Sequence, residues 1–265
     1  MLPTILAHEI QNGLKNFIIT GFESPTPYFQ GMFSRFVDGN GNLYKGPYLS
    51  INLPFQQGTA GTDFFSGFTT AFPPFLHQQN AWQRLQSTPH SASTIIATGT
   101  GSGKTECFLY PVLDHCLRHP GNGIKAIVIY PMNALATDQA KRFAEAISSS
   151  TALAGNIRVG LFVGDSEKSS HKTMGPDYVI TDKNVQRQAP PDILLTNYKM
   201  LDYLLLRPKD LPLWRFNQPE TLRYLIVDEL HTFDGAQGTD LACLIRRIKA
   251  RLETPQQHLV TVGTS

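Results

Sequence analysis

The feature that most constrains the fold is a glycine-rich turn set between a short apolar run and a helical stretch. The apolar run covers residues 94–97, and the turn begins at Gly99. Glycine allows the backbone to curl until several N–H groups point at one anion, and the N-terminus of the following helix adds partial positive charge. This strand–turn–helix order predicts a phosphate-binding loop in an α/β fold.

The side chains of this turn predict which part of a nucleotide each one holds. Lys104 can reach the β- and γ-phosphates, and the Thr105 hydroxyl can coordinate Mg²⁺. One position departs from the strict pattern, because Thr98 stands where that pattern has a glycine five residues before Gly103. The residues predicted to cradle the nucleotide are Thr98, Gly99, Thr100, Gly101, Ser102, Gly103, Lys104 and Thr105.

Acidic residues end a second apolar run, at residues 225–227. Such a run is typical of a buried parallel strand, and ligands of α/β sheets collect at the carboxyl ends of strands. Asp228 is predicted to hold Mg²⁺ directly or through water, Glu229 to activate the attacking water, and His231 to sense the γ-phosphate. A solvated strand end is the alternative, but the phosphate loop in the same chain argues against it. The predicted catalytic residues are Lys104, Asp228, Glu229 and His231.

Composition describes an ordinary globular protein. The chain has 265 residues, of which 41% are hydrophobic and 17% charged, with a net charge of +2. A nucleic-acid partner would therefore have to be held by a local basic patch rather than by overall charge. Cys107, Cys116 and Cys243 lack metal-binding spacing and predict free thiols in a reducing cytosol. Because no apolar run is long enough to cross a bilayer and no secretory signal is apparent, we expect a cytoplasmic protein without a membrane partner.

The first part of the chain, residues 1–71, is predicted to be an accessory segment. Residues Ile5–Ile19 have the apolar spacing of an amphipathic helix. Residues 38–41 predict a hairpin turn, and residues 48–53 alternate like an exposed strand.

Residues 72–265 alternate between strand and helix patterns, which predicts a parallel sheet between helices. A polar stretch at residues 164–191 is expected to be a surface excursion. The predicted strands are residues 94–97, 125–130, 157–162, 193–196, 222–228 and 258–263, and the predicted helices are residues 104–117, 134–148, 198–206 and 236–252.

A glutamine-containing stretch, residues 75–82, precedes the glycine-rich turn. Read alone, it predicts a helix start with a buried tryptophan. A glutamine amide also offers the donors and the acceptor that fit the N6 and N7 edge of adenine. Together with the two motifs above, the stretch resembles the Q motif of superfamily 2 helicases, which implies that Gln78 recognises the adenine of ATP.

Further motifs extend this resemblance over residues 72–265. Residues 130–139 look like helicase motif Ia, residues 193–201 like motif Ib, and residues 261–265 like the opening of motif III. Residues 228–231 form a DExH version of motif II. This motif is followed by Thr, an aromatic residue, a Gly-Ala pair and a helix ending in arginines. The same succession is found in the MrfA/YprA-like branch of DNA helicases and its large relatives in bacterial anti-phage systems.

The resemblance implies a RecA-like domain that binds ATP and Mg²⁺ and moves on single-stranded DNA. Motifs Ia and Ib would hold the sugar–phosphate backbone through N–H groups and small hydroxyls at helix N-termini. The implied DNA contacts are Pro131, Asn133, Ala134, Thr196 and Asn197.

The resemblance also implies a second RecA-like domain in the full-length chain, because the chain stops inside motif III. Arginines from that domain would be needed for fast hydrolysis, so the chain alone is expected to be nearly inactive. Partner proteins of a defence system are a further implication.

Three alternatives stay open on the sequence alone. The parent protein could translocate on double-stranded DNA without unwinding it, or it could bind nucleotide as the switch of a scaffold. Intact Lys104 and Glu229 argue against an inactive scaffold. Motifs that hold only the backbone also leave RNA as a substrate.

Overall fold

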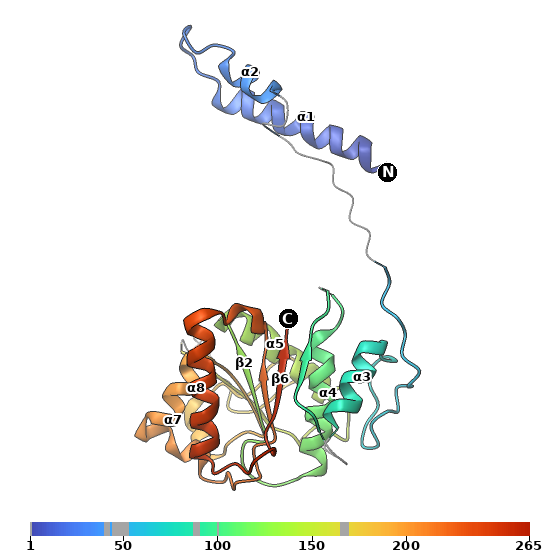
Figure 1. Cartoon of the computed structure of the whole chain (residues 1–265), viewed down its shortest axis with the longest axis vertical. Coiled ribbons are helices and arrows are strands. Elements are labelled where there is room, and N and C mark those ends of the chain that lie inside the picture. Colours follow the sequence, from blue (N-terminus) through green and yellow to red (C-terminus); the bar gives the residue numbers. More distant parts are fainter. Residues whose placement is uncertain (1, 40–42, 44–52, 87–90, 100, 165–169) are drawn as a thin grey trace. The chain divides into compact units, whose positions relative to one another are not determined.

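The chain folds as two compact units, Met1–Pro54 and Phe55–Ser265. A computed structural model describes residues 2–39, 43, 53–86, 91–99, 101–164 and 170–265 (Figure 1). The larger unit contains the motifs.

The smaller unit contains the predicted amphipathic helix, which is α1 (Pro3–Phe22), and a short second helix, α2 (Met32–Asp38). An ion pair between Lys15 and Asp38 joins them. Of the predicted hairpin turn, Asp38 is the last residue of α2 and Gly39 is its C-cap, and Asn40 and Gly41 lie outside the described residues. Residues 48–52 of the predicted strand also lie outside them, and Leu53 belongs to no strand.

The larger unit is built on a six-stranded parallel sheet, which confirms the predicted α/β class. Every predicted strand is present, with ends that differ by a few residues. The strand order is β1-β6-β5-β2-β4-β3. The strands are β1 (Thr94–Ile96), β2 (Ala126–Tyr130), β3 (Val159–Phe162), β4 (Ile193–Asn197), β5 (Tyr224–Val227) and β6 (Val260–Thr264).

Helices cover both faces of this sheet (Figure 1). Alternate residues of β2 belong to two separate cores: Val128 faces the core shared with α3, α4 and α5, and Ile127 faces the core shared with α7 and α8. The helices are α3 (Leu76–Leu85), α4 (Lys104–Arg118), α5 (Asn133–Ser148), α6 (Lys183–Gln188), α7 (Tyr198–Leu206) and α8 (Gly235–Arg251), with 3₁₀ turns η1 (Pro208–Trp214) and η2 (Leu230–Thr232).

The polar stretch at residues 164–191 is only partly a surface excursion. It contains α6, which begins where the Asp182 carboxylate accepts hydrogen bonds from the Asn184 and Val185 amides. Gln186 in this helix is fully buried and donates to the carbonyls of Leu161 and Ile180. Because one turn of helix carries so little apolar periodicity, the sequence pattern did not predict it.

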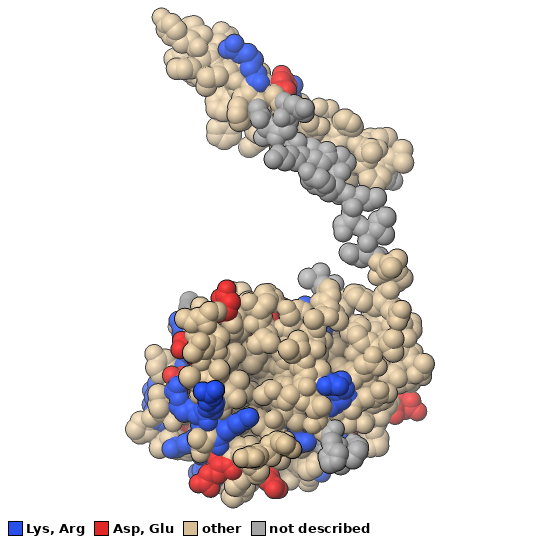
Figure 2. All heavy atoms as spheres, in the orientation of Figure 1, with Lys and Arg blue, Asp and Glu red and all other residues tan. Residues whose placement is uncertain are grey.

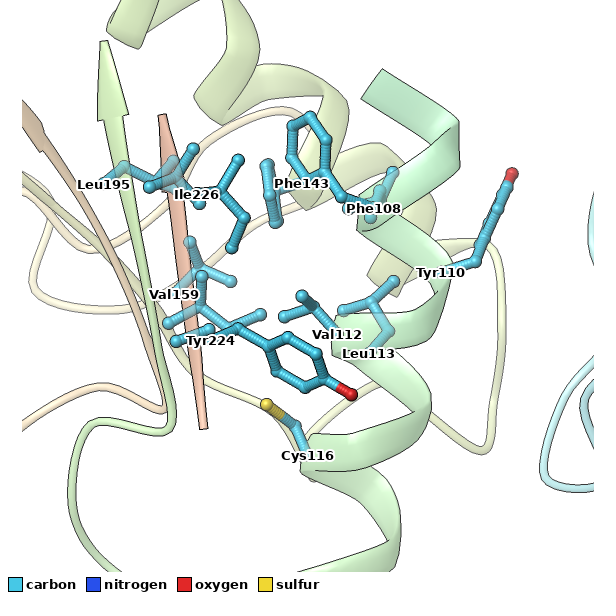
Figure 3. Close-up of a cluster of buried hydrophobic side chains, with 14 of the residues drawn as sticks. Phe108, Tyr110, Val112, Leu113, Cys116, Phe143, Val159, Leu195, Tyr224 and Ile226 are labelled. Atoms are coloured by element: carbon cyan, nitrogen blue, oxygen red, sulfur yellow. The ribbon is translucent and has the colours of Figure 1, made fainter. Parts of the chain in front are cut away.

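Helix α4 is anchored to the sheet by apolar side chains along one of its faces. Phe108, Val112 and Leu113 are at most 1% exposed, and Figure 3 shows them facing Tyr224 and Ile226 of β5. Burial of side chains of this size stabilises the packing by about 1.5–3 kcal/mol each. The first residue of α4 is the loop lysine, so this packing fixes the loop against the sheet.

The boundary between the two units lies earlier than residue 71, where the sequence pattern predicted it. Residues 55–71 belong to the larger unit because their phenylalanines pack on α3 and α4. The ring of Phe65 lies 5.2 Å from those of both Phe68 and Trp82. The Trp82 indole N–H donates to the Glu106 carbonyl at 2.9 Å, which ties α3 to the first turn of α4.

This aromatic packing makes a prediction about stability. Phe65 is 3% exposed, so Phe65→Ala is expected to lower the free energy of unfolding by about 3–5 kcal/mol. Leu206→Ala, at a site that is 60% exposed, should change it by less than about 0.5 kcal/mol. Urea unfolding of both variants measures the difference. Equal losses would show that residues 55–71 are not part of the larger unit's core.

Candidate nucleotide site

The strand order brings the glycine-rich turn and the acidic pair to the same edge of the sheet. The turn follows β1 and the pair follows β5, and β6 lies between these two strands. Ile96 of β1 pairs with Thr264 of β6, and Val227 of β5 pairs with Gly263. All three strands therefore end together, with their carboxyl ends on one side.

The glycine-rich turn is held closed by its own polar groups. The hydroxyls of Thr98 and Ser102 are 2.6 Å apart, and the Lys104 ammonium donates to the Thr98 carbonyl at 3.3 Å. Gly103 has a φ of 75°, a left-handed conformation that favours glycine, and α4 begins at the next residue. Thr98 thus closes the loop at the position where the strict pattern has glycine. Thr100 lies outside the described residues.

Most of the predicted nucleotide and catalytic residues line one cavity of about 590 Å³. Lys104 and Thr105 enter it from the start of α4, and Asp228 and Glu229 enter it from the end of β5. His231 is not among the lining residues; its ring is exposed, and its Nδ1 lies 3.5 Å from a Glu229 carboxylate oxygen. The full lining is Gln57, Phe72, Pro73, Phe75, Gln78, Gly101, Ser102, Gly103, Lys104, Thr105, Glu106, Leu135, Gln139, Arg142, Asp228 and Glu229.

Thr264 on β6 joins the two acidic residues. Its hydroxyl donates to the Asp228 carboxylate and accepts a hydrogen bond from the Glu229 amide at 3.1 Å. Asp228 is 6% exposed, and burial raises the pKa of its carboxyl, while the bond from Thr264 acts in the opposite direction. Thr264 was not among the predicted site residues. The signal for it was the resemblance of residues 261–265 to motif III.

Glu229 stands in a backbone conformation that few residues other than glycine adopt. Its φ is 50° and its ψ is 49°, in the left-handed region. Such a conformation costs about 1–3 kcal/mol and persists where surrounding contacts enforce it. Here the bond from the Glu229 amide to Thr264 supplies one such contact, and the chain then enters the 3₁₀ turn η2.

The oxygen atoms in the cavity fit Mg²⁺. Thr105 and Asp228 supply a hydroxyl and a carboxylate, the hard oxygen ligands that this ion accepts alongside water and phosphate. Two residues that the sequence pattern did not predict contact Thr105 from α5. The Thr105 hydroxyl donates to Gln139 Oε1 at 3.1 Å and accepts from Arg142 Nη1 at 3.1 Å.

Gln78 connects the Q-motif stretch to the glycine-rich turn. Its Oε1 accepts from the Phe75 amide at 2.9 Å, and its Nε2 donates to the Gly103 carbonyl at 3.1 Å. A glutamine amide has a second lone pair and a second hydrogen, so these bonds leave one acceptor and one donor site for a base edge. Gln78 is 6% exposed and lines the cavity.

The predicted DNA contacts lie at the N-termini of α5 and α7, and these two ends are joined. The Asn197 side chain caps α7 by accepting from the Met200 amide at 2.7 Å, and its Nδ2 donates to Asn133 Oδ1 at 2.7 Å. Ala134 is exposed, and Pro131 is half-buried. Thr196 is fully buried, and its hydroxyl donates to the Phe162 carbonyl at 2.6 Å, so the structure does not present that hydroxyl to a nucleic acid.

Basic side chains gather locally despite the low net charge. On the face shown in Figure 2, Lys and Arg collect over α8. The second half of that helix includes Arg246, Arg247, Lys249 and Arg251, all exposed, and Arg247 also pairs with Asp202 of α7. A local patch of this kind is what the composition required of a nucleic-acid-binding protein.

A sequence profile of the DEAD/DEAH box helicases matches residues 75–265. The chain belongs to the DEAD/DEAH box helicase family. The family assignment confirms the predicted helicase resemblance and accounts for the ATP-site motifs.

Individual helicases agree with this assignment. Druantia protein DruE of Escherichia coli (strain UMEA 4076-1) is 26% identical over an alignment of 316 residues, which covers 83% of this chain and 17% of DruE. Uncharacterized ATP-dependent helicase YprA of Bacillus subtilis (strain 168) is 30% identical over 175 residues, covering 66% of this chain and 20% of YprA. The crystal structure of the DUF1998 helicase MrfA bound to DNA and AMPPNP matches with a TM-score of 0.57 at 29% identity, covering 74% of this chain and 24% of that one.

The part that matches this chain is a minor part of these relatives. The chain spans 17–25% of the length of the first three curated relatives it matches. Within the part of the chain that the structure describes, no helix combines the length and the apolar character that a membrane crossing requires.

Alanine substitutions at two glycines of the phosphate loop are expected to have different effects. A Cβ at Gly103 would collide with the Gln78 amide and force a left-handed conformation on alanine, whereas a Cβ at Gly99 meets nothing within 4 Å. Gly103→Ala is therefore expected to destabilise the loop by about 1–3 kcal/mol and to weaken nucleotide binding, while Gly99→Ala, which keeps the backbone amide and meets no neighbour, should have the smaller effect on both. Thermal unfolding and the Kd of a fluorescent ATP analogue measure both. Equal effects of the two substitutions would contradict the loop geometry.

Proposed function

We propose that residues 72–265 are the first RecA-like domain of an ATP-dependent DNA helicase or translocase. The observation that carries this proposal is the meeting of Lys104, Thr105, Asp228 and Glu229 in one cavity. Phosphate-binding, cation-binding and water-activating groups are needed together for ATP hydrolysis, and they come here from two separate strand ends. Residues 55–71 pack on this domain, and the smaller unit, Met1–Pro54, would be an accessory segment.

The residues that the motifs predicted have separate roles in this proposal. Lys104 and the loop amides would bind the triphosphate, and Gln78 would recognise adenine. Thr105 and Asp228 would hold Mg²⁺, which would supply positive charge to offset the negative charge of the phosphates. Glu229 would orient and deprotonate the attacking water. His231, exposed beside Glu229, would report the state of the γ-phosphate to the rest of the motor.

Contacts to single-stranded DNA are proposed at the N-termini of α5 and α7. Backbone N–H groups at helix N-termini bind phosphates without reading sequence. Asn133 and Asn197 connect the two ends, so one strand could lie across both. The likeness to MrfA, whose crystal structure contains DNA and AMPPNP, supports DNA as the nucleic acid.

A longer protein is part of the proposal. The relatives are four to six times longer than their matching parts, so a second RecA-like domain that completes the ATP site is expected. The likeness to Druantia protein DruE supports a role in bacterial anti-phage defence, with partner proteins of that system.

One variant of the full-length protein should lose ATP hydrolysis but keep nucleotide binding. Glu229→Gln keeps the shape of the side chain but removes the base, so ATP hydrolysis should fall about 100- to 10,000-fold. Nucleotide binding should be retained, because Lys104 and the loop are unchanged. Glu145→Gln is the matched control, since Glu145 lies on the surface of α5 paired with Lys141. DNA-stimulated phosphate release is measured for both. Unchanged hydrolysis in Glu229→Gln would contradict the assignment of the base.

A further inference from the structure

The hydroxyl of Thr105 has two partners, and both come from α5. Thr105 is 6% exposed; its hydroxyl donates to Gln139 Oε1 and accepts from Arg142 Nη1, each at 3.1 Å. A hydroxyl has one hydrogen and two lone pairs. Its hydrogen and one lone pair are therefore committed to α5 in this structure.

The two partners have opposite effects on a cation at the same oxygen. Gln139 accepts the hydroxyl hydrogen, which turns the lone pairs away from Gln139 and makes them available to a cation. Arg142 donates to one of those lone pairs and places a positive charge beside it, which opposes a cation. Gln139 therefore prepares Thr105 as a cation ligand, and Arg142 competes with the cation for the Thr105 oxygen.

Arg142 has a second acceptor close by. Its Nη2 lies 3.8 Å from Oε1 of Glu106, and Oε2 of Glu106 is buried and accepts no hydrogen bond from any residue in the described ranges. A buried acceptor without a donor is unfavourable, and an arginine can satisfy both oxygens of a carboxylate at once. Movement of the Arg142 guanidinium from Thr105 to Glu106 would therefore be favourable once a cation occupies Thr105.

We propose that Arg142 is an exchangeable partner of Thr105 that regulates entry of Mg²⁺ into the nucleotide site, and that Gln139 is a positioning residue that orients the Thr105 hydroxyl for the ion. Arg142 bonds Thr105 when the site is empty and bonds Glu106 when the ion and nucleotide are bound. This proposal rests on the proposed ATP site. Because α5 begins at Asn133, a proposed DNA contact, the helix that contacts the strand also carries both regulators of the ion.

The test is the effect of Mg²⁺ on the affinity of the chain for mant-ADP, a fluorescent nucleotide without a γ-phosphate. The ratio of the Kd in EDTA to the Kd in Mg²⁺ isolates the contribution of the ion. Arg142→Met removes the competitor and should raise this ratio, by about three- to tenfold. Gln139→Met keeps the length of the side chain but removes the acceptor, so it should lower the ratio by a similar factor.

Lys141→Met provides the matched control. Lys141 is the sequence neighbour of Arg142, but it lies on the surface, 3.8 Å from Glu145, and should leave the ratio unchanged. Thermal unfolding of each variant, with and without mant-ADP, shows whether the fold is retained. Shifts of the same sign in Arg142→Met and Gln139→Met, or no shift in Arg142→Met, would overturn the proposal while leaving nucleotide binding intact. If the unaltered chain does not bind mant-ADP, or binds it equally with and without Mg²⁺, the proposed ATP site itself is wrong.

Discussion

Strand β6 is the element on which the site depends. It pairs with β1 on one side and β5 on the other, so the phosphate loop and the acidic pair are separated by a single strand. At its end, the Thr264 hydroxyl bonds the Asp228 carboxylate and the Glu229 amide. The Ser265 amide bonds the Ile96 carbonyl at 2.9 Å, and the Thr98 amide bonds the Ser265 carbonyl at 3.3 Å. Thr264 and Ser265 thereby connect the phosphate loop to the acidic pair.

Apolar packing below this edge of the sheet holds the polar side chains of the site in place. The face of α4 that follows the phosphate loop is buried against β5 and α5, and the aromatic cluster around Trp82 holds the Q-motif helix against the same end of α4. This arrangement buries a charged carboxylate, which is unfavourable. Asp228 is desolvated, which raises the pKa of its carboxyl, and a bound cation would offset that cost. Groups with shifted pKa values in a cavity are typical of functional sites.

The sequence predicted the elements that carry long apolar patterns. Buried parallel strands read as continuous apolar runs, and residues 126–130 and 224–227 show such runs clearly. The short helices α2 and α6 were not predicted, because one or two turns give little periodicity and α6 is polar. The unit boundary was placed too late because the phenylalanines of residues 64–68 follow no helical or strand period, although they pack on Trp82.

Within the site, motifs predicted the residues that touch the cavity from the two strand ends. They did not predict Thr264, Gln139 or Arg142, because their roles come from contacts between elements far apart in the chain. Thr196 is the opposite case, a motif residue whose hydroxyl is not available to a ligand. It lies in a motif, but its hydroxyl is committed to the carbonyl of Phe162 in the neighbouring strand β3. Sequence spacing identifies which residues share an edge of the sheet, and only the packing decides which side chains are available there.

The central claim is that one divalent cation is held between the phosphate loop and the acidic pair. The most direct measurement is anomalous scattering from a crystal of the protein grown with Mn²⁺ and a non-hydrolysable ATP analogue. We expect one strong peak bonded to Thr105 Oγ1 and linked to Asp228 directly or through water, with the phosphates reaching Lys104. Nucleotide and metal bound elsewhere on the molecule, with the cavity left empty, would contradict this account.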